Sequence, residues 1–229
     1  MSSEIKVYRM AVCLYPGVTM LDFQGPVDIL CSFGRKHRKS LASLFTTLPD
    51  VAIEEEYLSH NTEPVTPFTG AQIIPTMTYE QGLQTDFGII LVPGGPKEPK
   101  EIPPAIFEFL KKKSPETEYV LSVCTGSWVL AAAGVLNGKR ATTNKALYKI
   151  VTEDTKDLNI TWVPKARWVV NDDKHIWTAS GVTAGMDLAY AFLVHLVGEK
   201  FADEMKGIVE FRTVKDSEED EFATYHGLV

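Results

Sequence analysis

Residues 118 to 135 constrain the fold of this chain more than any other stretch. They begin with a short apolar run rich in β-branched residues, the pattern of a buried strand. From Gly126 onward the stretch is rich in alanine, leucine and other residues that favour helix. A strand that turns directly into a helix holds the turn residue, here Cys124, at the carboxyl edge of a sheet, where open α/β sheets bind ligands. The stretch therefore predicts an α/β protein with Cys124 at a functional edge.

Cys124 has two interpretations in this setting. The positive end of the helix dipole favours the thiolate, which makes Cys124 a candidate nucleophile. Gly126 then leaves room for the tight turn and for a substrate. A buried core cysteine is the alternative, because cysteine is among the most buried residue types and small apolar pockets hold it well. Residues 118 to 135 alone leave both interpretations open.

The rest of the chain alternates strand-like and helix-like segments, which predicts one domain over residues 1–229 with a largely parallel sheet and helices on both faces. Residues 18–33 predict a helical turn, an interruption at Gly25-Pro26 and an amphipathic helix. Strands are expected at 6–15, 44–47, 53–59 and 87–92, two short ones within 64–74, and a hairpin turn at 171–173. The acidic stretch 215–221 is expected to be mobile.

Composition narrows the class of protein. The net charge of −7 argues against general affinity for nucleic acid or anionic membranes. The three cysteines are too widely spaced for a disulfide framework and fit a reducing compartment. The N-terminal residues show no apolar signal core, and no apolar run approaches the ~20 residues of a membrane helix. We therefore expect a cytoplasmic protein whose size allows a nuclear share, and no ligand spacing indicates a metal site.

Four motifs in matching order resemble the DJ-1/PfpI (ThiJ) superfamily. V-C-T-G-S-x-x-L-A-x-A-G resembles its cysteine elbow and L-V-P-G-G its second loop; L-D-F-Q-G-P-V-D-I-L and S-G-V-T-A-G-M-D-L-A resemble its first and last long helices. The resemblance implies a flavodoxin-like three-layer α/β sandwich with a mostly parallel central sheet. It also implies a homodimer, with the first helix near the interface, and no metal or organic cofactor.

Asp22 indicates a subgroup within that superfamily. Members resembling DJ-1 itself carry glutamate at this position, whereas V-T-x-L-D-x-x-G-P with a C-T-G elbow is similar to the isocyanide (isonitrile) hydratases. Those cofactor-free hydro-lyases add water to R–N≡C, a small-molecule substrate, and give an N-substituted formamide. The resemblance makes Cys124 the nucleophile that forms a thioimidate and Asp22 the general acid and base. Apolar neighbours are expected to raise the pKa of Asp22; the alternative for Asp22 is a helix cap.

The family's Gly-Gly turn lies beside the elbow, so the resemblance places Gly94, Gly95 and Thr125 around the substrate. Backbone N–H groups of Gly95 and Thr125 would face developing negative charge, and the Thr125 hydroxyl would bond substrate. The alternatives are a tight turn for Gly94-Gly95 and a helix cap for Thr125. Many relatives carry a histidine after A-T-T, but this chain has Asn144. Asparagine exchanges no proton, so a Cys–His dyad is absent at that position.

Other functions stay open at this point. A cofactor-independent glyoxalase is one alternative, and a redox sensor or stress protein that oxidises Cys124 to sulfinic acid is another. A ligand-sensing domain of the AraC type is a third, although this chain is too short for the helix-turn-helix such regulators carry. We expect Cys13, Cys31 and Trp128 in the core, and His175 and His195 to be structural or exposed. Asp187 is expected to hold the helix start or an interface.

Overall fold

A seven-stranded sheet forms the centre of the protein in the computed structural model, which describes residues 5–171 and 173–229. The strand order is β3-β2-β1-β4-β5-β9-β8, and every neighbouring pair is parallel except β8–β9. The predicted mostly parallel α/β fold is confirmed. The strands are β1 (Lys6–Cys13), β2 (Val51–Ser59), β3 (Met77–Thr78), β4 (Ile89–Val92), β5 (Tyr119–Ser122), β8 (Trp168–Val170) and β9 (Ile176–Ala179).

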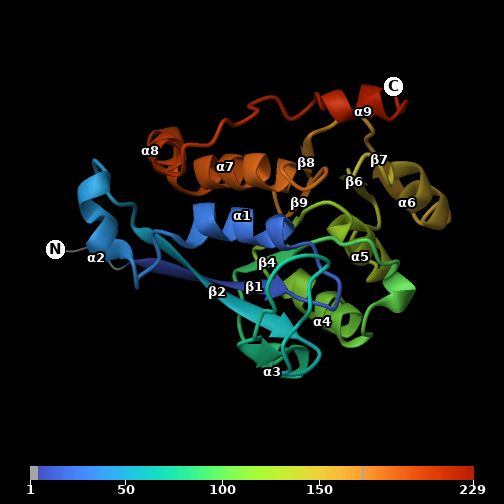
Figure 1. Ribbon diagram of the computed structural model, residues 1–229, viewed down its shortest axis with the longest axis horizontal. Helices are drawn as coiled ribbons and strands as arrows, with labels where there is room; N and C mark the ends of the chain where they lie inside the picture. The colour runs from blue at the N-terminus through green and yellow to red at the C-terminus, as the bar shows by residue number, and fades with distance from the viewer. Residues whose placement is uncertain (1–4, 172) are drawn as a thin grey trace.

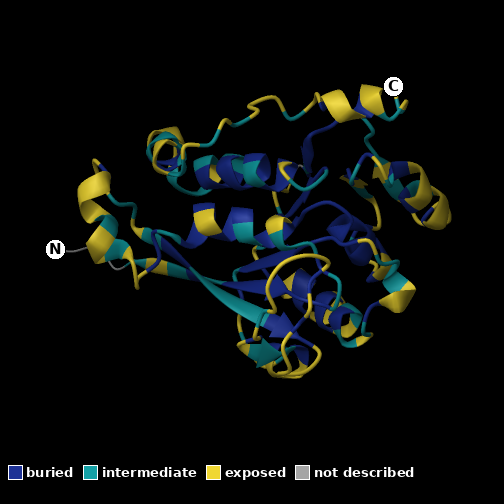
Figure 2. Cartoon of the chain, viewed as in Figure 1, coloured by how far each residue is buried: buried dark blue, intermediate teal, exposed yellow. Residues whose placement is uncertain are grey.

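Helices cover both faces of this sheet (Figure 1). One layer contains α1 (Met20–Cys31), α7 (Ala184–Val197) and α8 (Glu199–Val209), and the other α3 (Tyr79–Gly82), α4 (Ala105–Lys113) and α5 (Gly126–Ala132). Figure 2 shows the central strands and the inner helix faces buried. β4 is buried at all four positions, because a strand covered on both faces contacts solvent on neither.

Smaller elements surround these layers. A separate parallel pair, β6 (Lys139–Ala141) and β7 (Ile160–Trp162), lies outside the main sheet. The remaining helices are α2 (Arg38–Leu41), α6 (Tyr148–Asp154) and α9 (Glu221–Tyr225), and 3₁₀ turns occupy Ala42–Leu44, Pro99–Glu101 and Ser114–Glu116. Within the described part of the chain, no helix is both long and apolar enough to cross a bilayer.

The predicted interruption at Gly25-Pro26 is wrong, because α1 runs continuously through Pro26. An internal proline removes one helical hydrogen bond, so packing must outweigh local propensity. α7 supplies that packing. A Cβ added at Gly25 would lie 2.9 Å from the Met186 side chain, and one added at Gly185 would lie 3.4 Å from the Pro26 ring. The two helices therefore meet closely at these small residues.

Two other local predictions need correction. The strand expected at 44–47 is not formed; residues 42–44 are a 3₁₀ turn, and Phe45 packs on Phe201 of α8 with ring centroids 4.8 Å apart. The two strands expected within 64–74 reduce to one antiparallel bridge, Val65–Ile73. In both cases tertiary contacts override the local pattern. Within the acidic stretch 215–221, the Ser217 carbonyl accepts a hydrogen bond from Arg167 N–H at 2.8 Å, and the mobility expected for this stretch stays a prediction.

Two predictions fall on residues outside the described ones. The hairpin turn expected at 171–173 includes Asp172, although β8 and β9 on either side pair as an antiparallel hairpin. Residues 1–4 belong to the N-terminal stretch expected to lack a signal core. The parallel strands all end at one edge of the sheet, and the segments that follow β4, β5 and β9 meet there.

Candidate active site

Cys124 lies in the turn between β5 and α5, with a φ of 59°. This left-handed conformation costs about 1–2 kcal/mol for a residue with a Cβ, and it turns the side chain out of the sheet edge. The Cys124 N–H donates to the Ser180 carbonyl at 2.8 Å, which fixes the elbow to the segment after β9. Gly126 must be glycine, because a Cβ there would lie 2.0 Å from the Val92 carbonyl oxygen.

Asp22 lies in the first turn of α1 and is fully buried. Its Oδ2 accepts a hydrogen bond from Gly94 N–H at 2.9 Å, and Thr19 N–H donates to the Gly94 carbonyl at 2.9 Å. These bonds hold the start of α1 against the loop after β4. Thr19 is the N-cap residue, so Asp22 is not the helix cap.

Burial raises the pKa of Asp22 to about 7, against hydrogen bonds from Gly94 N–H and the Cys124 thiol that lower it. The expectation of a raised pKa is confirmed. Among the described atoms, Oδ1 is buried without a well-formed hydrogen bond, so the thiol contact is a weak one. A carboxyl in this state changes protonation near neutral pH, as a proton carrier must.

Cys124 is only 6% exposed. Burial, followed by the charge of Asp22, raises the pKa of the Cys124 thiol to about 12. Hydrogen bonds from the N–H groups of Thr125 and Val182 and from the Asn144 side chain oppose this shift. The expectation that the helix dipole favours the thiolate is therefore wrong for the resting protein, because desolvation outweighs the dipole of a helix of seven residues.

Asn144 contacts the sulfur from the position after A-T-T, where the family resemblance implies a histidine. Its Oδ1 accepts a hydrogen bond from Leu147 N–H at 3.2 Å, which leaves Nδ2 directed the other way. Nδ2 lies 2.8 Å from the point where a Gly181 Cβ would be, and the amide donates to the Cys124 sulfur. Asn144 can therefore stabilise charge on sulfur without exchanging a proton.

The Gly-Gly turn and Thr125 form a closed set of contacts. Gly95 N–H donates to the Thr125 hydroxyl at 2.9 Å, and that hydroxyl donates to the Gly95 carbonyl at 2.7 Å. Gly94 N–H is used by Asp22 and Thr125 N–H by the sulfur. In this state Gly95 N–H is directed to Thr125, and the Thr125 side chain makes no helix-capping bond. Roles of these groups toward substrate stay predictions.

The remaining sequence candidates lie elsewhere. Cys13 and Cys31 are buried, and burial raises the pKa of both thiols. His195 lies at Tyr119, with Nε2 3.3 Å from its hydroxyl. Trp128 donates to Asp154 from the core. Asp187 was expected to hold a helix start or an interface; it accepts two hydrogen bonds from Arg167, at 3.0 and 2.8 Å.

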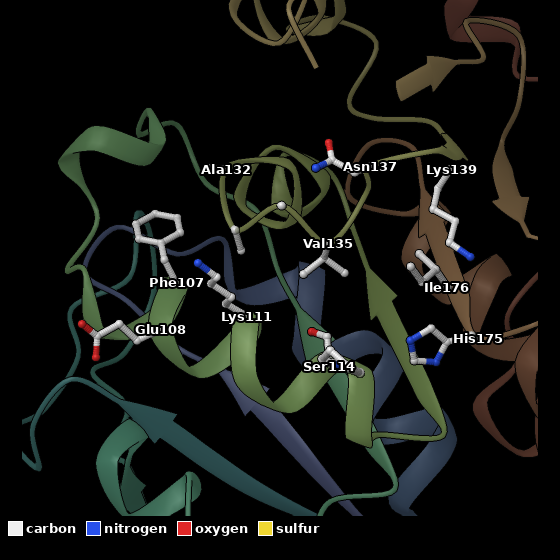
Figure 3. A pocket seen from close by; sticks show the side chains of 13 residues that line it. Phe107, Glu108, Lys111, Ser114, Ala132, Val135, Asn137, Lys139, His175 and Ile176 are labelled. Carbon is white, nitrogen blue, oxygen red and sulfur yellow. The ribbon is translucent and has the colours of Figure 1, made fainter. Parts of the chain in front are cut away.

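Two of the cavities among the described residues lie at opposite edges of the sheet. One, of about 150 Å³, is bordered by Asn144 and Gly181 beside the elbow and by Phe222 and His226 from the end of the chain. Sequence patterns gave no signal for either of the last two residues. A larger surface cleft of about 720 Å³ lies among Phe107, Lys111, Val135 and His175 (Figure 3). Its residues flank the starts of β5 and β9, so this cleft lies at the edge opposite Cys124.

Among the described residues, no group of three His, Cys, Asp or Glu side chains is placed to hold a metal ion. A buried thiol lies beside a buried carboxyl that titrates near neutral pH, and three N–H donors surround the sulfur. Such a site can add a thiol to an electrophilic carbon and move the thiol proton.

Comparisons with known proteins agree with this geometry. The model of the DJ-1/PfpI family matches residues 8–195. An isonitrile hydratase of Pseudomonas putida is 36% identical over 191 residues, 83% of this chain and 72% of that protein. The glutathione-independent glyoxalase DJR-1.2 of Caenorhabditis elegans is 33% identical over 98 residues, 42% of this chain and 52% of that protein.

Solved structures show the same fold. A ThiJ/PfpI family protein from Pseudomonas syringae superimposes with a TM-score of 0.71 at 24% identity, covering 92% of this chain and 78% of the other. DJ-1beta of Drosophila melanogaster superimposes with a TM-score of 0.68 at 19% identity, covering 90% of this chain and 99% of the other. The predicted resemblance is confirmed at the level of family and fold.

Proposed function

The chain belongs to the DJ-1/PfpI family, and from that premise we propose that it is an isonitrile hydratase. This hydro-lyase would add water to R–N≡C and release an N-substituted formamide. The observation that carries the proposal is the pairing of the Cys124 thiol with Asp22, a buried carboxyl whose pKa is about 7. The 36% identity to an isonitrile hydratase supports the same reaction.

The first step is addition of the thiol across the isonitrile carbon. Because the thiol keeps its proton at rest, attack requires a base, and ionised Asp22 is the carboxylate in contact with it. Asp22 takes the proton while the S–C bond forms, and it then gives that proton to the same carbon. The product is a thioimidate, R–N=CH–S–Cys124, with Asp22 ionised again.

The second step is hydrolysis of the thioimidate. The water oxygen bonds to the imidate carbon while Asp22 takes a proton from that water. Asp22 then gives this proton to the imidate nitrogen. The C–S bond then breaks, and the hydroxyl proton returns to sulfur, which leaves R–NH–CHO and the free thiol. Donors from Thr125, Val182 and Asn144 stabilise the negative charge that develops on the departing sulfur.

The test follows formamide formation from an aryl isonitrile. We expect turnover by the wild type, and loss of at least about a thousandfold in both Cys124→Ala and Asp22→Asn, since each removes a group that touches the reacting atoms. Cys31→Ala is the matched control, because Cys31 is equally buried but lies at the other end of α1.

Other products would support the other functions. Lactate from methylglyoxal without formamide would favour a glyoxalase, a reading weakened by Asn144 in place of a histidine base. Neither product, together with a mass gain of two oxygens on Cys124, would favour a redox sensor. The raised thiol pKa and low exposure argue against ready oxidation, because susceptibility follows thiolate character and access.

We further propose that the protein acts as a homodimer that joins through α1. Leu21 on this helix is 44% exposed, and Phe68 in the loop bonded to Val18 is 65% exposed. Contiguous exposed apolar patches mark interaction sites, and we propose that these two side chains belong to one such patch. Sedimentation of the wild type and of Leu21→Asp tests this, with a dimer expected only for the wild type.

A further inference from the structure

Tyr15 is a buried tyrosine that the proposed mechanism does not use. It follows the end of β1 and is only 1% exposed. Its hydroxyl donates a hydrogen bond to the Pro93 carbonyl at 3.0 Å. Burial, followed by the charges of Asp22 and Cys124, raises the pKa of Tyr15 well above its usual value. The hydroxyl therefore keeps its proton at neutral pH, and the charges of both reacting groups act on it.

The carbonyl that Tyr15 bonds belongs to the same peptide group as the N–H that bonds Asp22. The Pro93 C=O and the Gly94 N–H point in opposite directions from one planar peptide bond. That N–H donates to Asp22 Oδ2 at 2.9 Å. Tyr15 and Asp22 therefore hold opposite sides of one rigid peptide group, so a change at the hydroxyl is transmitted to the carboxyl.

The loop that contains this peptide packs closely on the turn between β1 and α1. Thr19 N–H donates to the Gly94 carbonyl at 2.9 Å, one peptide further along the loop. A Cβ added at Gly95 would lie 2.6 Å from the Gly17 carbonyl oxygen and 3.4 Å from the Tyr15 hydroxyl oxygen. The loop and the turn therefore meet in close contact around the Tyr15 hydroxyl.

The Gly94 N–H is the main hydrogen-bond partner of the Asp22 carboxyl. Burial raises the pKa of Asp22, and the Gly94 bond opposes this shift more than the Cys124 thiol does. Oδ1 makes no well-formed hydrogen bond among the described atoms. Within the described chain, the titratable groups that face Asp22 are the Cys124 thiol from the elbow and the Tyr15 hydroxyl, and α7 presents the uncharged Met186 to α1. The strength of one N–H bond therefore largely decides how readily this carboxyl ionises.

We propose that Tyr15 is a positioning residue whose hydroxyl, through the Pro93–Gly94 peptide, orients and strengthens the N–H bond that stabilises ionised Asp22. A hydrogen bond accepted by a peptide carbonyl polarises that peptide, which makes its N–H a better donor. Without the hydroxyl, the buried Pro93 carbonyl loses this partner, and the peptide can tilt away from the carboxyl. The inference rests on the proposed hydratase function only for the role of Asp22 as the base.

The test compares the pH dependence of kcat/KM for phenyl isonitrile in wild type, Tyr15→Phe and Tyr79→Phe. Tyr15→Phe weakens the donor to the carboxylate, so the midpoint near 7 should rise by at least about 0.5 pH unit. The ratio of kcat/KM at pH 6 to its plateau value should then fall about threefold.

Tyr79→Phe is the matched control for this substitution. Tyr79 is 2% exposed, and its hydroxyl donates at 2.8 Å to the Leu14 carbonyl, which lies outside the loop after β4. Tyr79→Phe therefore removes the same kind of buried bond without touching the peptide that holds Asp22. Its midpoint should stay within about 0.2 pH unit of wild type, even where its stability falls as much as that of Tyr15→Phe.

A second readout does not depend on turnover. The carbon NMR signal of the Asp22 carboxyl, identified by its absence in Asp22→Asn, reports directly on protonation of this group. Its midpoint should rise in Tyr15→Phe. It should fall when 3-fluorotyrosine replaces tyrosine at position 15, because fluorine makes the hydroxyl a stronger donor. This replacement keeps the hydroxyl, so it decides the question if circular dichroism shows that Tyr15→Phe does not fold.

The outcomes separate the positioning role from the hydratase function. Unchanged carboxyl midpoints in the folded variants at position 15, or equal shifts in Tyr15→Phe and Tyr79→Phe, would overturn the inference. A wild type that makes no formamide, together with the carboxyl shift in Tyr15→Phe, would overturn the hydratase function and leave the role of Tyr15 assigned.

Discussion

The Thr125 hydroxyl and Gly95 hold each other by two hydrogen bonds, one accepted at 2.9 Å and one donated at 2.7 Å. This pair fastens the loop after β4 to the start of α5. The adjacent Gly94 N–H bonds Asp22, so the same loop sets the position of the carboxyl. The distance between the Asp22 carboxyl and the Cys124 sulfur therefore depends on the Thr125–Gly95 hydrogen bonds, although these bonds include neither group.

Thr125→Val should lower kcat/KM for an isonitrile about 10- to 100-fold, because valine leaves the buried N–H and carbonyl of Gly95 without a partner. Thr125→Ser keeps the hydroxyl and should stay within about threefold of wild type. Steady-state kinetics on both variants check this, and equal activities of the two would contradict it.

The pH dependence of kcat/KM should follow Asp22. The ionised carboxyl is the base for the first step and its pKa is about 7, so activity should rise with pH to a plateau with a midpoint near 7. Asp22→Asn should show a low, flat profile across the same range. A midpoint near 7 that persists in Asp22→Asn would assign the titration to another group.

Stability should also vary with pH through Asp22. Its pKa is raised from 3.8 to about 7 in the folded protein, so between these values the folded state holds a proton that the unfolded state releases. The free energy of unfolding therefore falls as pH rises from about 4 to 7, by up to about 4 kcal/mol from this group. Asp22→Asn lacks this term, so its stability relative to wild type should increase between pH 4.5 and 8. Urea unfolding at both pH values measures the change, and parallel behaviour of the two proteins would argue against a buried, titrating carboxyl.

The orientation of the Asn144 amide gives a prediction about thiol reactivity. Asn144→Asp keeps the acceptor for Leu147 N–H but places a second carboxylate oxygen toward sulfur. Like charge raises the thiol pKa further, so labelling of Cys124 by iodoacetamide at pH 8 should slow about tenfold or more. Asn144→Ala removes only the donor and should slow labelling less. Faster labelling of Asn144→Asp would show that the amide does not face the sulfur.

Gly94→Ala tests the close approach of the two loops. The added Cβ would lie 2.5 Å from Thr125 N and 3.0 Å from Asp22 Oδ2, so the loop must move. We expect a loss of about 1–3 kcal/mol in the free energy of unfolding and of at least about tenfold in kcat/KM. Gly207→Ala in α8 meets nothing within 4 Å and should stabilise the protein by about 0.5–1 kcal/mol without changing activity. If both substitutions change stability and activity similarly, the loss in Gly94→Ala would not come from the close approach of the two loops.

Much of the fold is predictable from the sequence, because the central strands are short apolar runs that end at glycine-rich turns. Local patterns fail where distant packing decides the structure. Pro26 stays inside α1 because α7 packs against it. The strand expected at 44–47 does not form, because the Phe45 ring stacks on Phe201. The position of α9 depends on Arg167, which precedes β8 and pairs with both Asp187 of α7 and Asp220 at the start of α9, and these ion pairs have no local signature.

The reacting groups of the site could be predicted from the sequence, but their protonation states only in part. Motifs point to Cys124 and Asp22, and apolar neighbours correctly predict the raised pKa of Asp22. The thiol pKa was predicted in the wrong direction, because the helix dipole can be read from the chain whereas the depth of burial cannot. The same reason hid Phe222 and His226, which the folded tail brings to the cavity bordered by Asn144 and Gly181.

Cys124 and Cys13 lie at different depths, so the labelling rates of their thiols can report on local opening and on global unfolding. Cys124 is 6% exposed at the sheet edge, whereas Cys13 is completely enclosed in β1. A small electrophile should reach the first sulfur through brief local opening and the second only after the whole sheet comes apart. The ratio of their labelling rates, followed along a denaturant series, would separate loosening around the elbow from complete unfolding in one experiment.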